Sequence, residues 1–180
     1  MSETKVAAAE AASKNSAPKD DKAAAKPAKK AVKKYVNQFS FSDPLQTKFV
    51  NSIMKNGKKR TAQRILQDTF AEMHRKGCEN PLEAFEKAIK NATPSIEVKP
   101  KRIGGAVYQI PMEVKATRQK SLPVRWILEG ARKKKGQPMH KRLATELLDA
   151  SNEAGFAFSR KEEVHRMAQA NKAFAHLARY

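Results

Sequence analysis

The sequence predicts a mainly α-helical protein, a bundle of about six helices from which one two-stranded β-hairpin protrudes. Three observations predict this fold. Apolar residues recur at helical spacing through most of residues 35–180, and the pairs Asp43-Pro44 and Asn80-Pro81 each place a proline directly after a capping residue. The spacing changes to a period of two only around residues 95–114. We therefore expect residues 35–180 to form a single helical domain with a hairpin arm.

Three helices are expected before the arm. The first begins at Asp43-Pro44 and ends at Asn56-Gly57, because glycine readily adopts the left-handed conformation at a helix end. The second runs from about Lys58 to Lys76, and the third begins at Asn80-Pro81. The side chains expected to face inward from these helices are Leu45, Phe49, Ile53, Ala62, Leu66, Thr69, Met73, Leu82, Phe85, Ile89 and Ala92.

Alternation of apolar and polar residues predicts the arm. We assign its apolar residues to one face of the ribbon and expect the charged Glu97 and Lys99 on the other. Gly104-Gly105 is expected to form the turn, since that turn needs positive φ angles. Proline cannot donate a ladder hydrogen bond, so prolines fit a ribbon whose strands each have a free edge. The residues assigned to the apolar face are Ile96, Val98, Tyr108, Ile110, Met112 and Val114, and the prolines are Pro100 and Pro111.

Three more helical stretches follow the arm. One resumes near Leu122 and ends at Gly136, and the next opens at Pro138 and stops at Gly155. Ser159 and Glu162 are expected to form the capping box of the last helix. The inward stripes comprise Val124, Ile127, Leu128, Ala131, Met139, Leu143, Leu147, Val164, Met167, Ala168, Asn171 and Ala175.

Charge is the dominant feature of the composition. Of the net charge of +19, residues 1–34 carry +5, from nine Lys against four acidic residues, and +14 therefore lies on residues 35–180. Residues 1–34 also contain eleven Ala and almost no large apolar residues, so we expect a disordered Ala/Lys-rich basic tail. A protein of this charge seeks a polyanion, and the excess on the body means that the tail alone does not account for it.

Several other classes of function lack support in the sequence. No apolar run approaches the ~20 residues of a spanning helix, and no secretory or transit peptide is recognisable. The single Cys78 fits a reducing compartment, and one Cys with four dispersed His matches no common zinc-ligand spacing. No catalytic triad or paired-carboxylate arrangement can be assigned. We therefore expect no cofactor, no metal, no membrane association and no enzymatic activity.

Three basic clusters at the joints between elements predict a nucleic-acid surface. They are Lys58 to Arg60, Lys99 to Arg102, and Arg132 to Lys135. Each cluster alone could be a solvated face, but three of them on a body of charge +14 favour binding to backbone phosphates. Trp126 next to Arg125 could stack on a base or pack in the core, and these two interpretations remain open.

Several stretches resemble one family in the order in which that family carries them. They are residues 43–59, the arm at residues 97–114, residues 122–132, and the ending at residues 165–176. Together they resemble the small-subunit ribosomal protein family S-seven (universal small-subunit protein seven), in its bacterial or organellar form. The resemblance covers about residues 35–180, whereas the Ala/Lys-rich tail is longer than the usual start of the family.

The resemblance implies a structural component of the small ribosomal subunit, in the cytoplasm and within the ribosome. It implies binding to the 3′ major domain of the small-subunit ribosomal RNA and nucleation of head assembly. It also implies messenger RNA and exit-site transfer RNA nearby, and neighbouring head and platform proteins as partners. The resulting RNA-binding candidates are Lys58, Lys59, Arg60, Lys99, Lys101, Arg102, Gly104, Gly105, Tyr108, Arg118, Arg125, Trp126, Arg132, Lys133, Lys134, Lys135 and Arg166.

Two other functions compete with this interpretation. The tail is similar to a linker-histone arm, so a DNA-architectural protein is the alternative, although such a domain would be smaller and would lack the proline-marked hairpin. An RNA-modifying enzyme would need a cofactor loop or an acid/base pair, and the sequence shows neither.

Overall fold

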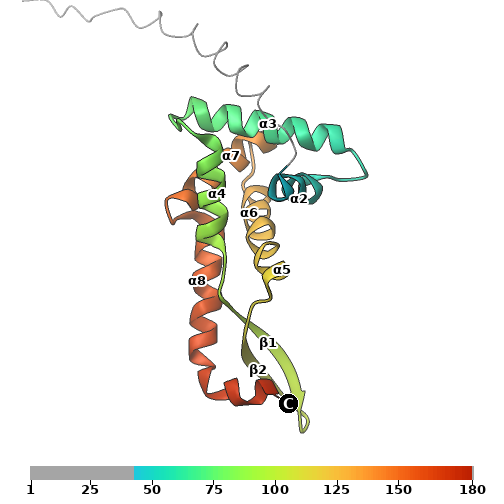
Figure 1. The fold of residues 1–180 in the computed structure, drawn as a ribbon, viewed down its shortest axis with the longest axis vertical. Coiled ribbons are helices and arrows are strands. Elements are labelled where there is room, and N and C mark those ends of the chain that lie inside the picture. The colour runs from blue at the N-terminus through green and yellow to red at the C-terminus, as the bar shows by residue number, and fades with distance from the viewer. Residues whose placement is uncertain (1–42, 180) are drawn as a thin grey trace, which may run out of the picture.

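The computed structural model describes residues 43–179, and the predicted tail at residues 1–34 lies outside them. Seven α-helices and one two-stranded sheet make up most of this part of the chain. The helices α2 to α7 form a body, and the ribbon leaves that body alongside α8 (Figure 1). The mainly α-helical fold with one hairpin is therefore confirmed. The helices are α2 Pro44–Ile53, α3 Lys59–Arg75, α4 Pro81–Ala92, α5 Ala116–Gln119, α6 Leu122–Lys133, α7 Met139–Ser151 and α8 Gly155–Ala170.

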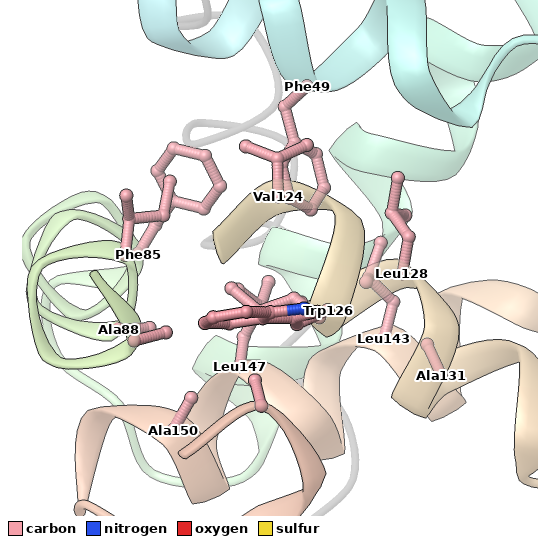
Figure 2. Close-up of a cluster of buried hydrophobic side chains, with 14 of the residues drawn as sticks. Phe49, Phe85, Ala88, Val124, Trp126, Leu128, Ala131, Leu143, Leu147 and Ala150 are labelled. Atoms are coloured by element: carbon pink, nitrogen blue, oxygen red, sulfur yellow. The ribbon is translucent and has the colours of Figure 1, made fainter. Parts of the chain in front are cut away.

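The core lies where α7 packs against α3, α4 and α6. Phe85 is central, because the rings of Phe49 and Phe70 both meet it edge to face, with centroids 5.1 and 5.6 Å away. Figure 2 shows Trp126 and Leu147 inside the same cluster. Most of the predicted inward stripes are buried here, but Leu82 and Met167 are 39% and 41% exposed and were assigned wrongly.

The last helix begins earlier than the sequence predicts. Gly155 is its first residue rather than the stop of α7, which ends at Ser151. The capping box at Ser159 is therefore wrong, and the Ser159 hydroxyl instead donates to the carbonyl of Gly155. A 3-10 segment, η1 Lys172–Arg179, follows α8 and turns toward the ribbon (Figure 1). The predicted stripe of the last helix fails from Ala175 onward because the helix has ended and Ala175 is exposed.

Strands β1 Ile96–Ile103 and β2 Ala106–Glu113 form the arm, and Gly104 and Gly105 turn between them with φ of 59° and 88°. The turn and the antiparallel pairing are as predicted. The Val114 N–H donates to the carbonyl of Ser95, so these two residues form a hydrogen-bonded pair. Such pairs recur at every second residue of an antiparallel ribbon, which places them at the odd-numbered residues of β1, up to the pair Ile103–Ala106. Pro100 and Pro111 fall at the intervening positions, where the missing N–H would point away from the partner strand.

The predicted apolar face of the arm is wrong for β1. Cross-strand partners share a face, and the register pairs Glu97 with Met112 and Lys99 with Ile110. The apolar residues of β1, Ile96 and Val98, therefore lie on the opposite face from Ile110 and Met112. Glu97 is buried and Ile96 is 38% exposed, which is the reverse of the expectation. Apolar and polar residues do alternate within each strand, but which faces of the two strands coincide depends on where the turn begins.

Candidate nucleic-acid interface

Two neighbouring hollows collect cationic side chains from three helices and the turn between α2 and α3. The larger, which we call the basic hollow, has a volume of about 490 Å³ and lies where the end of α2, the start of α3, the end of α6 and the start of α7 meet. The smaller, the α2–α6 groove, has a volume of about 330 Å³. Arg132 lines both, so the two form one continuous surface. The cations that line them are Lys48, Lys55, Lys58, Arg125, Arg132 and Arg142.

Local structure explains why these cations gather. Lys48 lies on α2 and lines the α2–α6 groove, whereas Lys55 follows the end of α2 at Ile53 and lines the basic hollow. The turn between α2 and α3 places Asn56 and Gly57 in the left-handed region, which folds Lys58 back beside Lys55. Arg132 donates from Nη2 to the carbonyl of Ser52 at 3.3 Å, which holds it across α2 and α6. No acidic residue lines either hollow.

The arm carries a second group of candidates. Arg102 and both turn glycines are exposed, and Lys101 is half-buried. Tyr108 is also half-buried, because its ring packs on Phe174 of η1 with centroids 5.3 Å apart. The tip beyond Tyr108 makes no such packing contact and exposes Val107 to 57%. A partner can therefore approach the backbone and charges of the tip, whereas η1 supports the arm nearer its middle.

Two candidates, Lys99 and Arg118, form an internal ion-pair cluster. Lys99 Nζ lies 3.1 Å from Glu97 Oε1, and Arg118 donates through Nε to Glu97 Oε2. Burial alone would raise the pKa of Glu97, but these hydrogen bonds outweigh it and the pKa is lowered from its usual value. Both cations stay about half exposed. They therefore anchor the base of the arm while still presenting charge to solvent.

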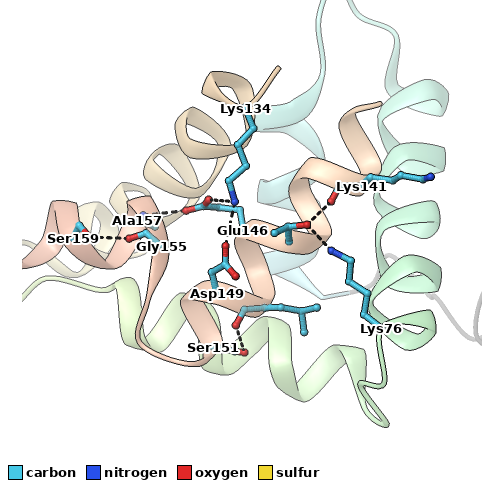
Figure 3. A network of polar contacts seen from close by, with 11 residues as sticks. Lys76, Lys134, Lys141, Glu146, Asp149, Ser151, Gly155, Ala157 and Ser159 are labelled. Atoms are coloured by element: carbon cyan, nitrogen blue, oxygen red, sulfur yellow. Dashed lines mark hydrogen bonds and ion pairs between the residues drawn. The ribbon is translucent and has the colours of Figure 1, made fainter. Parts of the chain in front are cut away.

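The predicted basic run Arg132 to Lys135 does not act as one surface. Lys133 lies 3.2 Å from Glu129 and its ammonium sits 3.9 Å from the ring centre of Phe156. Lys134 turns inward to Glu146, as Figure 3 shows, and Lys135 is exposed. Burial lowers the pKa of Lys134, but hydrogen bonds to Glu146 and Asp149 outweigh this and raise it. Lys134 is held by the fold, so Arg132 is the member of the run that lines the hollows.

Trp126 is not available for base stacking. Its side chain is 7% exposed and lies within the core cluster (Figure 2). Of the two interpretations that the sequence left open, packing in the core is therefore correct, and Trp126 as an RNA-binding residue is wrong. Its neighbour Arg125 is exposed on α6 and lines the α2–α6 groove. One step along a helix turns a side chain by about 100°, which separates the two roles.

Residues 43–179 contain no cluster of possible metal ligands and no helix suited to span a membrane. No group of three or more His, Cys, Asp or Glu in this range could hold a metal ion. No helix in the same range has the length and apolar character needed to cross a membrane. His165 accepts at Nε2 from the Ser95 N–H at 3.3 Å and so joins α8 to the base of the arm.

Comparison with known proteins adds the decisive observation. Residues 18–172, most of the chain, match the family described as ribosomal protein S7p/S5e. The chain belongs to this family. It is thus a structural component of the small ribosomal subunit and not an enzyme, as expected from the sequence.

Bacterial relatives are similar over most of their length. The small ribosomal subunit protein uS7 of Chloroflexus aggregans is 51% identical over 139 residues, which cover 77% of this chain and 88% of the relative. The uS7 proteins of Pseudothermotoga lettingae and Helicobacter hepaticus are 49% and 45% identical, over 81% and 82% of this chain and 94% and 96% of each relative. The chain is thus similar to the bacterial form of the S7p/S5e family.

Within this family member, sequence reasoning missed three residues of the cationic surface: Lys48, Lys55 and Arg142. They stand alone in the sequence rather than in runs, so clusters of consecutive charge do not reveal them. No helical spacing links Lys48 to Lys55, because α2 ends at Ile53. Arg142 also lacked a signal in the sequence, because its place depends on α7 lying against α6. The predicted Lys59, Arg60 and Arg166 are exposed, at the start of α3 and on α8, and line neither hollow.

Proposed function

We propose that this chain binds small-subunit ribosomal RNA in its 3′ major domain through the surface formed by the basic hollow and the α2–α6 groove, and that this contact nucleates assembly of the subunit head. One observation carries the proposal. Six cations from α2, α6, α7 and the α2–α3 turn line two adjoining hollows that contain no acidic lining residue. Such a surface attracts a phosphate backbone, and its concave form suits a folded RNA better than a flat charged face would.

The proposal gives the arm a separate task. Its exposed tip, Arg102 with Gly104 and Gly105, contacts messenger RNA and exit-site transfer RNA, and neighbouring head and platform proteins pack nearby. The support is the division of the arm itself: Glu97 and Tyr108 are held by the body and η1, and the tip is not. Residues 35–180 act as one domain in this scheme, and residues 1–34 add a basic tail.

A salt series tests the ribosomal RNA proposal. Binding of the full chain to a fragment of the 3′ major domain should weaken steeply with salt, with each phosphate contact adding about −0.7 to −0.9 to the log–log slope. Replacing Lys58 and Arg125 together with Gln should flatten the slope by about 1.4 to 1.8. The matched control is a pair of exposed α4 lysines, Lys87→Gln with Lys90→Gln, which line neither hollow. Equal effects of the two pairs would refute the proposed surface.

Competition with duplex DNA separates RNA binding from the DNA-architectural alternative. At equal salt, the ribosomal RNA fragment should displace the chain from random duplex DNA. A preference for the DNA would favour the alternative, since a protein that binds the phosphates of a duplex does not need the fold of a particular RNA.

A further inference from the structure

The basic hollow combines two kinds of lining. Ile53, Met54, Ile65 and Met139 give it an apolar floor, and the first of these is only 7% exposed. The cations Lys55, Lys58, Arg132 and Arg142 complete it. Its volume, about 490 Å³, falls in the range of pockets that enclose a small ligand. A surface for duplex phosphates alone requires charge but no apolar recess of this size.

Two guanidinium groups in the hollow are already held in place. Arg142 donates through Nη1 to the carbonyl of Lys134, and Arg132 donates through Nη2 to the carbonyl of Ser52. The Nε of Arg142 is buried and makes no hydrogen bond within residues 43–179. A guanidinium fixed by a backbone carbonyl offers its planar face at little entropic cost, and such planes stack on nucleobases.

The α2–α3 turn forms a firm edge to the hollow. Lys58 N–H donates to the carbonyl of Lys55 at 3.1 Å, and Lys59 N–H donates to the carbonyl of Gly57 at 2.8 Å. With Asn56 at φ 51° and Gly57 at φ 72°, this turn brings the two lysines Lys55 and Lys58 to one hollow. Two ammonium groups beside an apolar floor match a ligand that carries a phosphate next to a flat, largely apolar group.

We propose that the basic hollow holds one unpaired, unstacked nucleotide of RNA, with the base on the floor of Met54, Ile65 and Met139 and the phosphate at Lys55 and Lys58. A nucleotide in a duplex hides its base, whereas a splayed-out one presents base and phosphate together. This rests on the proposed function and deepens it. It makes part of the RNA contact a pocket for an extruded residue rather than a purely electrostatic one.

Methionine methyl NMR tests the proposal on the full chain. The probes are adenosine 5′-monophosphate, uridine 5′-monophosphate and inorganic phosphate at equal ionic strength. Both nucleotides should shift the Met54 and Met139 signals saturably, and phosphate alone should not. Met73, which is buried, and Met167, which is on α8, serve as internal references and should not move. Equal shifts with phosphate, or with a short poly-glutamate peptide, would overturn the proposal in favour of a general anion surface.

A charge-matched pair of variants localises the effect. Lys55→Glu at the edge of the hollow should weaken nucleotide binding by roughly tenfold or more, as expected for the loss of one hydrogen bond between charged groups. Lys87→Glu on α4 has the same charge change at another exposed position and should leave the nucleotide titration unchanged. Equal weakening by both would mean that only net charge matters and would overturn the proposal.

The ribosomal RNA fragment separates this proposal from the function on which it rests. With 2-aminopurine placed at unpaired positions one at a time, binding should unstack at least one of them, seen as increased fluorescence, and Met139→Glu should abolish that signal. Thermal melting of the variant confirms folding. If the fragment binds tightly and no position unstacks, the nucleotide site is wrong and RNA binding stands. If the fragment does not bind at all, the proposed function itself fails.

Discussion

The ammonium of Lys134 lies 2.9 Å from Oε2 of Glu146, a carboxylate with no exposed surface. The other oxygen of Glu146 accepts from the Ala157 N–H at 3.1 Å, in the first turn of α8 (Figure 3). Lys134 also lies 3.1 Å from Asp149. One carboxylate therefore fastens the end of α6 and the start of α8 to α7. A negative charge at a helix N-terminus is also favourable, because the first N–H groups of α8 point toward it.

Replacing Lys134 should destabilise the protein more than removing the charge of Glu146. Lys134→Met strands the buried charge of Glu146 and should cost about 2 kcal/mol of unfolding free energy, less than a fully buried pair because the Lys134 side chain is 37% exposed. Glu146→Gln keeps an acceptor for the Ala157 N–H and should cost about 1 kcal/mol. Urea denaturation measures both. The double variant should lose less than the sum, and strictly additive losses would show that the two residues do not interact.

Gly130→Ala should destabilise the protein although alanine favours helices. A Cβ at residue 130 would lie 2.8 Å from the carboxylate of Glu146 and 3.0 Å from Cβ of Phe156. We expect overpacking of about 2 kcal/mol to outweigh the gain of about 1 kcal/mol in helix propensity. Thermal unfolding measures the net loss. Combining Gly130→Ala with Glu146→Ala should relieve the crowding, so that Gly130→Ala costs less in the Glu146→Ala background than in the wild type.

The anchor of the arm at Glu97 should depend on pH in the acid range. Because its folded pKa is lowered, Glu97 contributes stability that is present above the ordinary value of 4.5 and is lost as the pH falls below it. The difference in melting temperature between the wild type and Glu97→Gln should therefore be largest near neutral pH and shrink below about pH 4.5. Glu113→Gln, an exposed change on β2, should alter the melting temperature little throughout. A constant difference for Glu97→Gln down to about pH 3 would contradict the ion-pair account.

The tip of the arm should be dispensable for folding and assembly. Removing Arg102, Ile103, Ala106 and Val107 while keeping Gly104-Gly105 leaves Lys101–Tyr108 as the closing pair, at a hydrogen-bonded position of the register. The contact of Tyr108 with Phe174 is retained. Subunits carrying this variant should assemble normally but maintain the reading frame less faithfully. Purification of variant subunits and a frameshift reporter measure the two effects.

The control for the shortened arm is Leu128→Asp. Leu128 is 3% exposed, so an unpaired charge there should cost about 4 kcal/mol and abolish incorporation. If the shortened arm blocks incorporation as completely as Leu128→Asp, then the tip is an assembly element. If it assembles and translation is unchanged in every respect, the tip has no role in contacts with messenger or transfer RNA.

Local signals in the sequence predict the elements well, and distant contacts decide what it misses. Asp43-Pro44, Asn80-Pro81 and Gly104-Gly105 mark element ends through backbone preferences that act within a few residues. The inward orientation of Lys134 depends on Glu146, twelve residues away on another helix, and no sequence neighbour of Lys134 indicates that partner. The start of α8 was missed for the same reason, since the Ala157 N–H in its first turn donates to Glu146 and not to a neighbouring capping side chain.

The family resemblance and the charge clusters predicted part of the candidate surface. Lys58, Arg125 and Arg132 line the hollows, whereas Trp126 does not. Trp126 was predicted wrongly because the spacing of apolar residues alone cannot say which side of α6 meets α7. Lys48, Lys55 and Arg142 joined them only through packing of α2, α3, α6 and α7. Positions along a helix follow from periodicity, but the meeting of four helix ends at one hollow follows only from the tertiary fold.

The two prolines of the arm have a consequence for the protein before it reaches a ribosome. Pro100 on β1 and Pro111 on β2 fall where their nitrogens face outward, so each outer edge lacks one of the donors that an added strand would need. A newly made copy would otherwise offer the outer edges of the ribbon as templates for strand addition by other copies. The prolines make both edges poorer templates for polymerisation, which disfavours strand pairing between free copies.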